Sequence, residues 1–120
     1  MLNGSCHCGA IKMEIAASLS SLTECNCSIC RRLGAQWAYY KRSEVTIDAE
    51  PDSLYSYSWG DKRIEFCRCN SCGCTTHYET LEKEPSSHMA VNARMIDSQD
   101  LTGIPIKRFD GADTWKYLDD

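Results

Sequence analysis

The side chains with the most evident chemistry in this sequence are thiols, and three of them lie within six residues. Cys25-Asn26-Cys27-Ser28-Ile29-Cys30 places two cysteines two residues apart and a third three residues later. If Cys25 and Cys27 belong to one strand, they share a face about 7 Å apart, and a turn after Cys27 returns Cys30 toward them. Three converging sulfurs are typical of a zinc site with an open fourth position.

Four further cysteines form two pairs that lie far apart in the sequence. Cys6 and Cys8 lie within a glycine-flanked segment, Gly4-Ser5-Cys6-His7-Cys8-Gly9, and Cys69 and Cys72 precede Gly73. Together the two pairs supply the four sulfurs of a closed, tetrahedral structural zinc. Such a zinc closes a loop of about sixty residues and constrains the unfolded chain.

The remaining two cysteines leave the state of the central site open. Cys67 or Cys74 can complete the triplet as a fourth ligand, and so can His7 or His77, which would make the site a second closed one. A small buried cysteine is also common as plain core filling. We expect the open site. A redox role for the Cys-x-x-Cys segments would require a thioredoxin-like βαβ context, which the surrounding pattern does not provide.

Composition narrows the class of protein. The chain has 120 residues, nine cysteines and a net charge of -4, and we expect one domain spanning residues 1–120. Seven thiolates holding two Zn²⁺ would make the charge roughly three units more negative, which disfavours nucleic-acid binding. No apolar run is long enough to cross a membrane, so we expect no membrane role. An odd number of clustered cysteines without an apolar leader predicts a reducing compartment, the cytoplasm by default.

The sequence pattern predicts that the elements that position the thiols are mainly short strands. Ile11, Met13 and Ile15 alternate with charged residues within 10–17, the pattern of a strand with one buried face. The other expected strands cover 22–27, 36–42, 45–47, 54–59, 62–68, 75–80 and 88–94. Gly60-Asp61 is expected to turn a hairpin, and the tail from Ile96 is expected to be mostly irregular. A short helix is expected over 29–33, capped by Ser28 and ended by Gly34.

Several segments together resemble the glutathione-dependent formaldehyde-activating enzyme family. They are Gly4-Ser5-Cys6-His7-Cys8-Gly9, Cys25-x-Cys27-x-x-Cys30-Arg31-Arg32, Cys69-x-x-Cys72-Gly73, Val91-Asn92-Ala93-Arg94, Phe109-Asp110-Gly111 and Asp113-Thr114-Trp115. The resemblance implies a mainly β, zinc-stapled Mss4-like fold with one or two short helices, shared with centromere protein V, Rab-associated Mss4 proteins and methionine sulfoxide reductase B. It also implies a structural zinc on Cys6, Cys8, Cys69 and Cys72 and a catalytic zinc on Cys25, Cys27 and Cys30.

The resemblance further implies two Zn²⁺ per chain, with glutathione as co-substrate, and the chemistry of a carbon-sulfur lyase. Three thiolates leave the site with a net charge of about -1, which suits capture of a thiol more than generation of hydroxide. The expected reaction joins a thiol to formaldehyde or a similar small carbonyl, or reverses that addition. Trp37, Tyr39, Tyr40, Asn92 and Arg94 are candidates for the wall of a glutathione pocket, while Arg31 and Arg32 are more typical of a solvated helix. The alternative is a zinc module of the same fold that binds a partner without catalysis.

Overall fold

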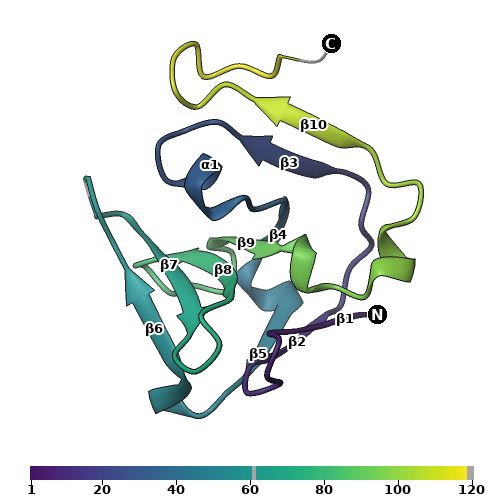
Figure 1. The fold of residues 1–120 in the computed structure, drawn as a ribbon, viewed down its shortest axis with the longest axis vertical. Coiled ribbons are helices and arrows are strands. Elements are labelled where there is room, and N and C mark those ends of the chain that lie inside the picture. The colour runs from purple at the N-terminus through teal and green to yellow at the C-terminus, as the bar shows by residue number, and fades with distance from the viewer. Residues whose placement is uncertain (61, 119–120) are drawn as a thin grey trace.

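The computed structural model describes residues 1–60 and 62–118, and this part of the chain folds into two β-sheets (Figure 1). The smaller sheet is antiparallel, with the strands β1 (Leu2–Ser5), β2 (Lys12–Ile15) and β5 (Val45–Asp48) in that order. The larger has the spatial order β10 (Ile106–Phe109), β3 (Leu22–Cys25), β4 (Trp37–Lys41), β9 (His88–Asn92), β8 (Thr75–Thr80), β7 (Ile64–Cys69) and β6 (Leu54–Tyr57). The helices are α1 (Cys30–Leu33) and the 3-10 helices η1 (Arg42–Glu44), η2 (Pro51–Ser53), η3 (Ala93–Met95) and η4 (Ser98–Leu101).

The main hydrophobic core joins the two sheets. Met13 and Ile15 of β2 are fully buried while Lys12 and Glu14 between them are exposed, as the alternation in the sequence predicts. Residues of both sheets make up this core: Met13, Ile15, Leu22, Ala38, Tyr40, Val45, Met89, Val91, Ala93 and Ile96. One face of the larger sheet is therefore buried in the main hydrophobic core.

The other face of the larger sheet carries a second, aromatic cluster. Trp37, Phe66 and Ala90 are buried there together with Cys30, and Tyr78 packs against them. Each of these strand residues alternates with a neighbour that points to the opposite face. The same strands thus build the main core on one side and surround the central cysteines on the other.

The prediction of a mainly β, Mss4-like fold with few short helices is confirmed, but the predicted cap of α1 is wrong. The tail from Ile96 is mostly irregular as expected, but it also contains the strand β10, which adds to the edge of the larger sheet in parallel with β3 (Figure 1). Ser28 does not cap α1: the Cys27 sulfur accepts the Cys30 N–H at 3.4 Å, and the Cys27 carbonyl accepts the Arg31 N–H. Gly34 ends the helix in a left-handed conformation as expected.

Two further predictions concern the hairpin and the membrane. The strands on either side of the predicted Gly60-Asp61 turn pair as an antiparallel hairpin, and Asp61 itself lies outside the described residues. Among the helices of the described ranges, none is long and apolar enough to span a bilayer.

Candidate metal centre

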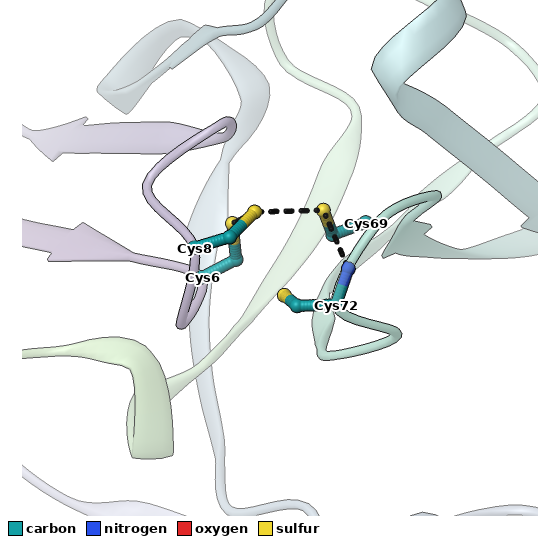
Figure 2. A group of neighbouring side chains, drawn as sticks. All are labelled: Cys6, Cys8, Cys69 and Cys72. Atoms are coloured by element: carbon teal, nitrogen blue, oxygen red, sulfur yellow. Dashed lines mark hydrogen bonds between the residues drawn. The ribbon is translucent and has the colours of Figure 1, made fainter.

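The two distant cysteine pairs meet in one cluster (Figure 2). Its members are Cys6 and Cys8, which precede β2, and Cys69 and Cys72, which lie at the end of β7 and just after it. All four sulfurs lie within 4.8 Å of one another. The Cys6 and Cys8 sulfurs are 3.7 Å apart, and those of Cys8 and Cys69 are 3.5 Å apart. Tetrahedral zinc with Zn–S bonds of about 2.3 Å requires sulfurs about 3.8 Å apart, so the four residues fit this metal.

Backbone N–H groups in the same cluster point at sulfur. Ile11 donates to Cys6, and Ser71 and Cys72 donate to Cys69, at 3.3 to 3.4 Å. The backbone N–H of Cys74 and then that of Cys8 lower the pKa of Cys72 to about 5. Hydrogen bonds to the charged form favour thiolate, which is the form that binds zinc. The donor set therefore matches a structural, four-thiolate site.

The central triplet is also assembled, from three different kinds of local structure. Cys25 ends β3, Cys27 lies in the following turn, and Cys30 begins α1, with all three sulfurs within 4.8 Å of one another. The expectation that Cys25 and Cys27 share one strand is wrong. The strand stops because Asn26 binds the tail, donating to Asp110 Oδ1 at 3.0 Å and accepting the Ala112 N–H at 3.0 Å.

The three thiols of the triplet differ in acidity. Burial raises the pKa of Cys25 and that of Cys30, although the Trp37 Nε1–H donates to the Cys30 sulfur at 3.4 Å. Burial also acts on Cys27, but hydrogen bonds from the Cys30 backbone and side chain outweigh it and lower the pKa of Cys27. Cys27 is therefore the most acidic thiol of the triplet. A cation that binds there must displace the protons of Cys25 and Cys30.

Cys67 and His77 lie away from the triplet. They are register partners on β7 and β8, and with Glu79 they form a third group whose ligand atoms lie within 4.8 Å of one another. Phe66 and Tyr78 face the triplet cluster, so their neighbours Cys67 and His77 point to the other face of the sheet. Cys74 is adjacent to Cys72 and accepts a hydrogen bond from the His7 backbone. Within the described ranges, no histidine, cysteine or carboxylate joins the triplet as a fourth ligand.

Two adjoining cavities open onto the triplet. The larger, of about 420 Å³, is mostly apolar and is lined by Cys25, Cys27, Ile29, Cys30, Trp37, Tyr39, Trp59, Gly60, Ile64, Phe66, Tyr78, Phe109, Gly111 and Trp115. The smaller, of about 330 Å³, shares Cys25, Cys30 and Phe109 with it, and its charged lining residues are Glu24, Arg31, Arg94 and Arg108. The triplet thus lies where an aromatic chamber meets an arginine-lined one.

The residues proposed for a glutathione pocket divide between these walls and the interior. Trp37 and Tyr39 line the aromatic cavity, and Arg94 lines the smaller one. Tyr40 belongs to the main core instead. Asn92 is buried and ties strands together, donating to the Thr75 carbonyl at 2.9 Å and accepting the Gln36 and Arg94 N–H groups.

Of the two helix arginines, only Arg31 borders a cavity that reaches the triplet, whereas Arg32 lines a separate cavity with Ser28 and Trp59. Arg32 donates to the Ser28 carbonyl at 2.7 Å and fastens the turn that precedes α1. Both arginines are exposed residues of α1, as expected, and Arg31 in addition contributes positive charge beside Cys25 and Cys30.

The tail supplies site residues that spacing alone did not indicate. Asp110 is buried, accepts hydrogen bonds from Asn26 and from the Thr114 hydroxyl at 2.8 Å, and its backbone oxygen accepts the Trp115 N–H at 2.7 Å. These bonds hold the loop 110–115 over Cys25. The only signal in the sequence was the resemblance of this segment to a known family.

The comparison with protein families settles the membership of the chain. The model described as "Glutathione-dependent formaldehyde-activating enzyme" matches residues 1–109. The chain belongs to this family. Its members are named for a formaldehyde-activating role that depends on glutathione, and the cysteine clusters of this member lie within the matched range.

A solved structure shows the same fold. A crystal structure of a Rhodobacter sphaeroides protein superposes with a TM-score of 0.69 at 28% sequence identity. The match covers 87% of this chain and 98% of the other. The fold of this chain is therefore also found in a protein whose structure was determined by experiment.

Proposed function

We propose that this protein is a zinc-dependent enzyme that forms or cleaves a carbon-sulfur bond between a thiol such as glutathione and formaldehyde or a similar carbonyl compound. The observation that carries the proposal is the triplet of Cys25, Cys27 and Cys30, which has no fourth protein ligand within the described residues and lies at the meeting point of two cavities. Family membership supports the same reaction class.

Each part of the site has a role in this proposal. The three cysteines would hold the metal, which supplies, when bound, a Lewis acid that keeps an incoming thiol in its thiolate form. Glutathione carries two carboxylates. Three arginines, Arg31, Arg94 and Arg108, outweigh the one carboxylate of Glu24 and give the smaller cavity the net positive charge that such a ligand requires. The otherwise acidic chain thereby gains a local basic surface for an acidic ligand.

In this proposal the carbonyl compound occupies the aromatic cavity, beside the thiol. Holding both reactants in one place lowers the entropic cost of the addition. The Tyr39 hydroxyl, like that of any tyrosine, is protonated at neutral pH, and Tyr39 lines this cavity, so it can donate a hydrogen bond to the oxygen that becomes negatively charged. The sulfur-carbon bond forms, the carbonyl π pair moves to oxygen, and the thiol proton ends on that oxygen without any change of oxidation state.

The test is NMR exchange spectroscopy of glutathione and its hydroxymethyl adduct in the presence of formaldehyde. The zinc-loaded protein should exchange the two species faster than the spontaneous rate, and Cys25→Ser, Cys27→Ser and Cys30→Ser should each abolish the enhancement. Cys67→Ala is the matched control, because it removes a buried cysteine that points away from the triplet. An exchange rate equal to the spontaneous one with wild-type protein contradicts formaldehyde as the carbonyl compound. The same result with larger aldehydes as well would contradict the proposal and favour a non-catalytic zinc module.

A further inference from the structure

The larger cavity gathers an unusual share of the chain's aromatic side chains. All three tryptophans and both phenylalanines of the sequence line it, together with Tyr39 and Tyr78. Within the described residues, no aspartate, glutamate, lysine or arginine contributes to this wall. The chamber wall is mostly apolar, and its polar side-chain groups are the cysteines at one end, two phenol groups and the indole N–H groups of the tryptophans.

The size of the chamber exceeds what a one-carbon substrate needs. Cavities that hold small organic ligands have volumes of roughly 300–1,000 Å³, and this one, at about 420 Å³, lies within that range. A hydroxymethyl group has two non-hydrogen atoms and would leave most of the aromatic wall in contact with water. Apolar surface of that extent is stabilised when a ligand covers it.

The rim of the chamber has exposed aromatic surface that such a ligand would cover. Trp59 and Trp115 are 44% and 69% exposed, so their rings have a large uncovered surface. Trp115 has a φ of 60°, a backbone conformation that bulky residues rarely adopt, and the Trp115 N–H bond to the Asp110 carbonyl and an edge contact with Phe109 hold it there. Strain of this kind persists where the surrounding structure requires a side chain in a particular place.

We propose that the carbonyl partner of this enzyme carries an aromatic group, so that the substrate class is an aromatic aldehyde and its thiol adduct rather than formaldehyde alone. The inference rests on the proposed function. The thiol sulfur forms a bond with the aldehyde carbon, the carbonyl π pair becomes a lone pair on oxygen, and that oxygen takes the thiol proton. The aromatic group occupies the chamber while the carboxylates of the thiol face the arginines of the adjoining cavity.

The first test measures binding of two stable analogues to the zinc-loaded protein by isothermal titration calorimetry. S-benzylglutathione and S-methylglutathione share the same charges and differ in the group that would enter the chamber. The benzyl compound should bind at least tenfold more tightly, because it covers aromatic wall that the methyl group leaves exposed. Equal affinities, or tighter binding of the methyl compound, would overturn the inference.

Variants at the rim locate the preference. Trp115→Ala and Trp59→Ala should each reduce the ratio of benzyl to methyl affinity about three- to tenfold. Tyr55→Ala is the matched control, since Tyr55 is 53% exposed, stacks on Arg68 and lies outside the chamber. An affinity ratio that both tryptophan variants leave unchanged would show that the benzyl group binds elsewhere.

A rate measurement separates failure of this inference from failure of the proposed function. The enhancement of thiol exchange over the spontaneous rate should be larger with benzaldehyde than with formaldehyde. Enhancement with formaldehyde only would overturn the inference and leave the proposed function standing. No enhancement with either aldehyde would overturn both.

Discussion

Gly111 lies so close to Cys25 that a Cβ atom on residue 111 would stand 2.5 Å from the Cys25 sulfur. The same Cβ would be 3.3 Å from the Cβ of Cys27. The Gly111 backbone N–H also donates to the Cys25 sulfur. The tail therefore closes against the triplet through backbone, and only glycine fits at this position.

Replacing Gly111 should weaken the triplet as a metal site. Gly111→Ala should reduce its affinity for Co²⁺ or Zn²⁺ about 10- to 100-fold, as is typical when a group that orients a metal ligand is lost. Competition with a chromophoric chelator measures this. Gly103→Ala is the control, because Gly103 has open space around it and a positive φ, so its substitution costs backbone strain without touching a cysteine. Equal metal affinity of Gly111→Ala and wild type would contradict the close contact.

Asp110 should determine whether the tail stays over the site. Asp110→Ala removes the acceptor of the Asn26 amide, the Thr114 N–H and the Thr114 hydroxyl. Hydrogen-deuterium exchange of residues 110–118 should become faster, while β1, β2 and β5 in the other sheet keep their protection. Exchange that is unchanged in 110–118 would show that other contacts suffice to hold the loop.

The stability of the fold should depend on Glu79 in acid. Its pKa is lowered to about 2 despite burial, chiefly by His77, whose Nε2 lies 3.5 Å from Glu79 Oε2, with help from Arg42 and Lys83. A folded-state pKa below the ordinary 4.5 means that the contribution is fully present above pH 4.5 and is lost as the pH falls toward 2. Glu79→Gln should reduce the free energy of unfolding by about 1–3 kcal/mol at pH 7.

Urea denaturation at pH 7, 4 and 3 tests this dependence. The difference between wild type and Glu79→Gln should narrow with acid, while loss of zinc affects both proteins alike. Glu82→Gln, at an exposed position, should lower stability by little at any pH. A constant difference from pH 7 to pH 3 would rule out the Glu79 carboxylate as its source.

The metal content should divide between the two cysteine clusters. Purified protein should carry two zinc ions per chain by elemental analysis, and Cys27→Ser should retain one of them and remain folded. Cys72→Ser should instead lose the circular dichroism of the folded state, because a structural zinc contributes directly to folding free energy. A wild-type content of one zinc per chain, unchanged in Cys27→Ser, would exclude the triplet as a metal site.

Local periodicity predicted the inner strands well because their burial follows from neighbours in sequence. Met13 and Ile15 alternate with charged residues and face the main core. The strand β10 gave no such signal, since Ile106, Lys107 and Arg108 are all exposed and its pairing with β3 joins segments some eighty residues apart. Edge strands of this kind are held by distant backbone partners, which a local pattern cannot show.

The cysteine spacing predicted which thiols come together, but it did not predict what surrounds them. Both clusters assemble as their positions suggest. One departure arises from a hydrogen bond between distant segments, because Asn26 leaves the strand to bind Asp110. The other is local, because the Cys27 sulfur takes the capping role expected of Ser28. Cys67 was ambiguous because its facing direction depends on the β7–β8 register, which places it opposite His77.

The most direct test of the open thiolate site replaces zinc with Co²⁺ and follows the visible spectrum while glutathione is added. The account predicts a change in the d–d and charge-transfer bands as a fourth sulfur joins the metal, a change absent in Cys27→Ser and retained in Cys67→Ala. A wild-type spectrum that does not respond to glutathione, but begins to respond when Cys67 is replaced by alanine, would contradict it and identify a closed, structural site.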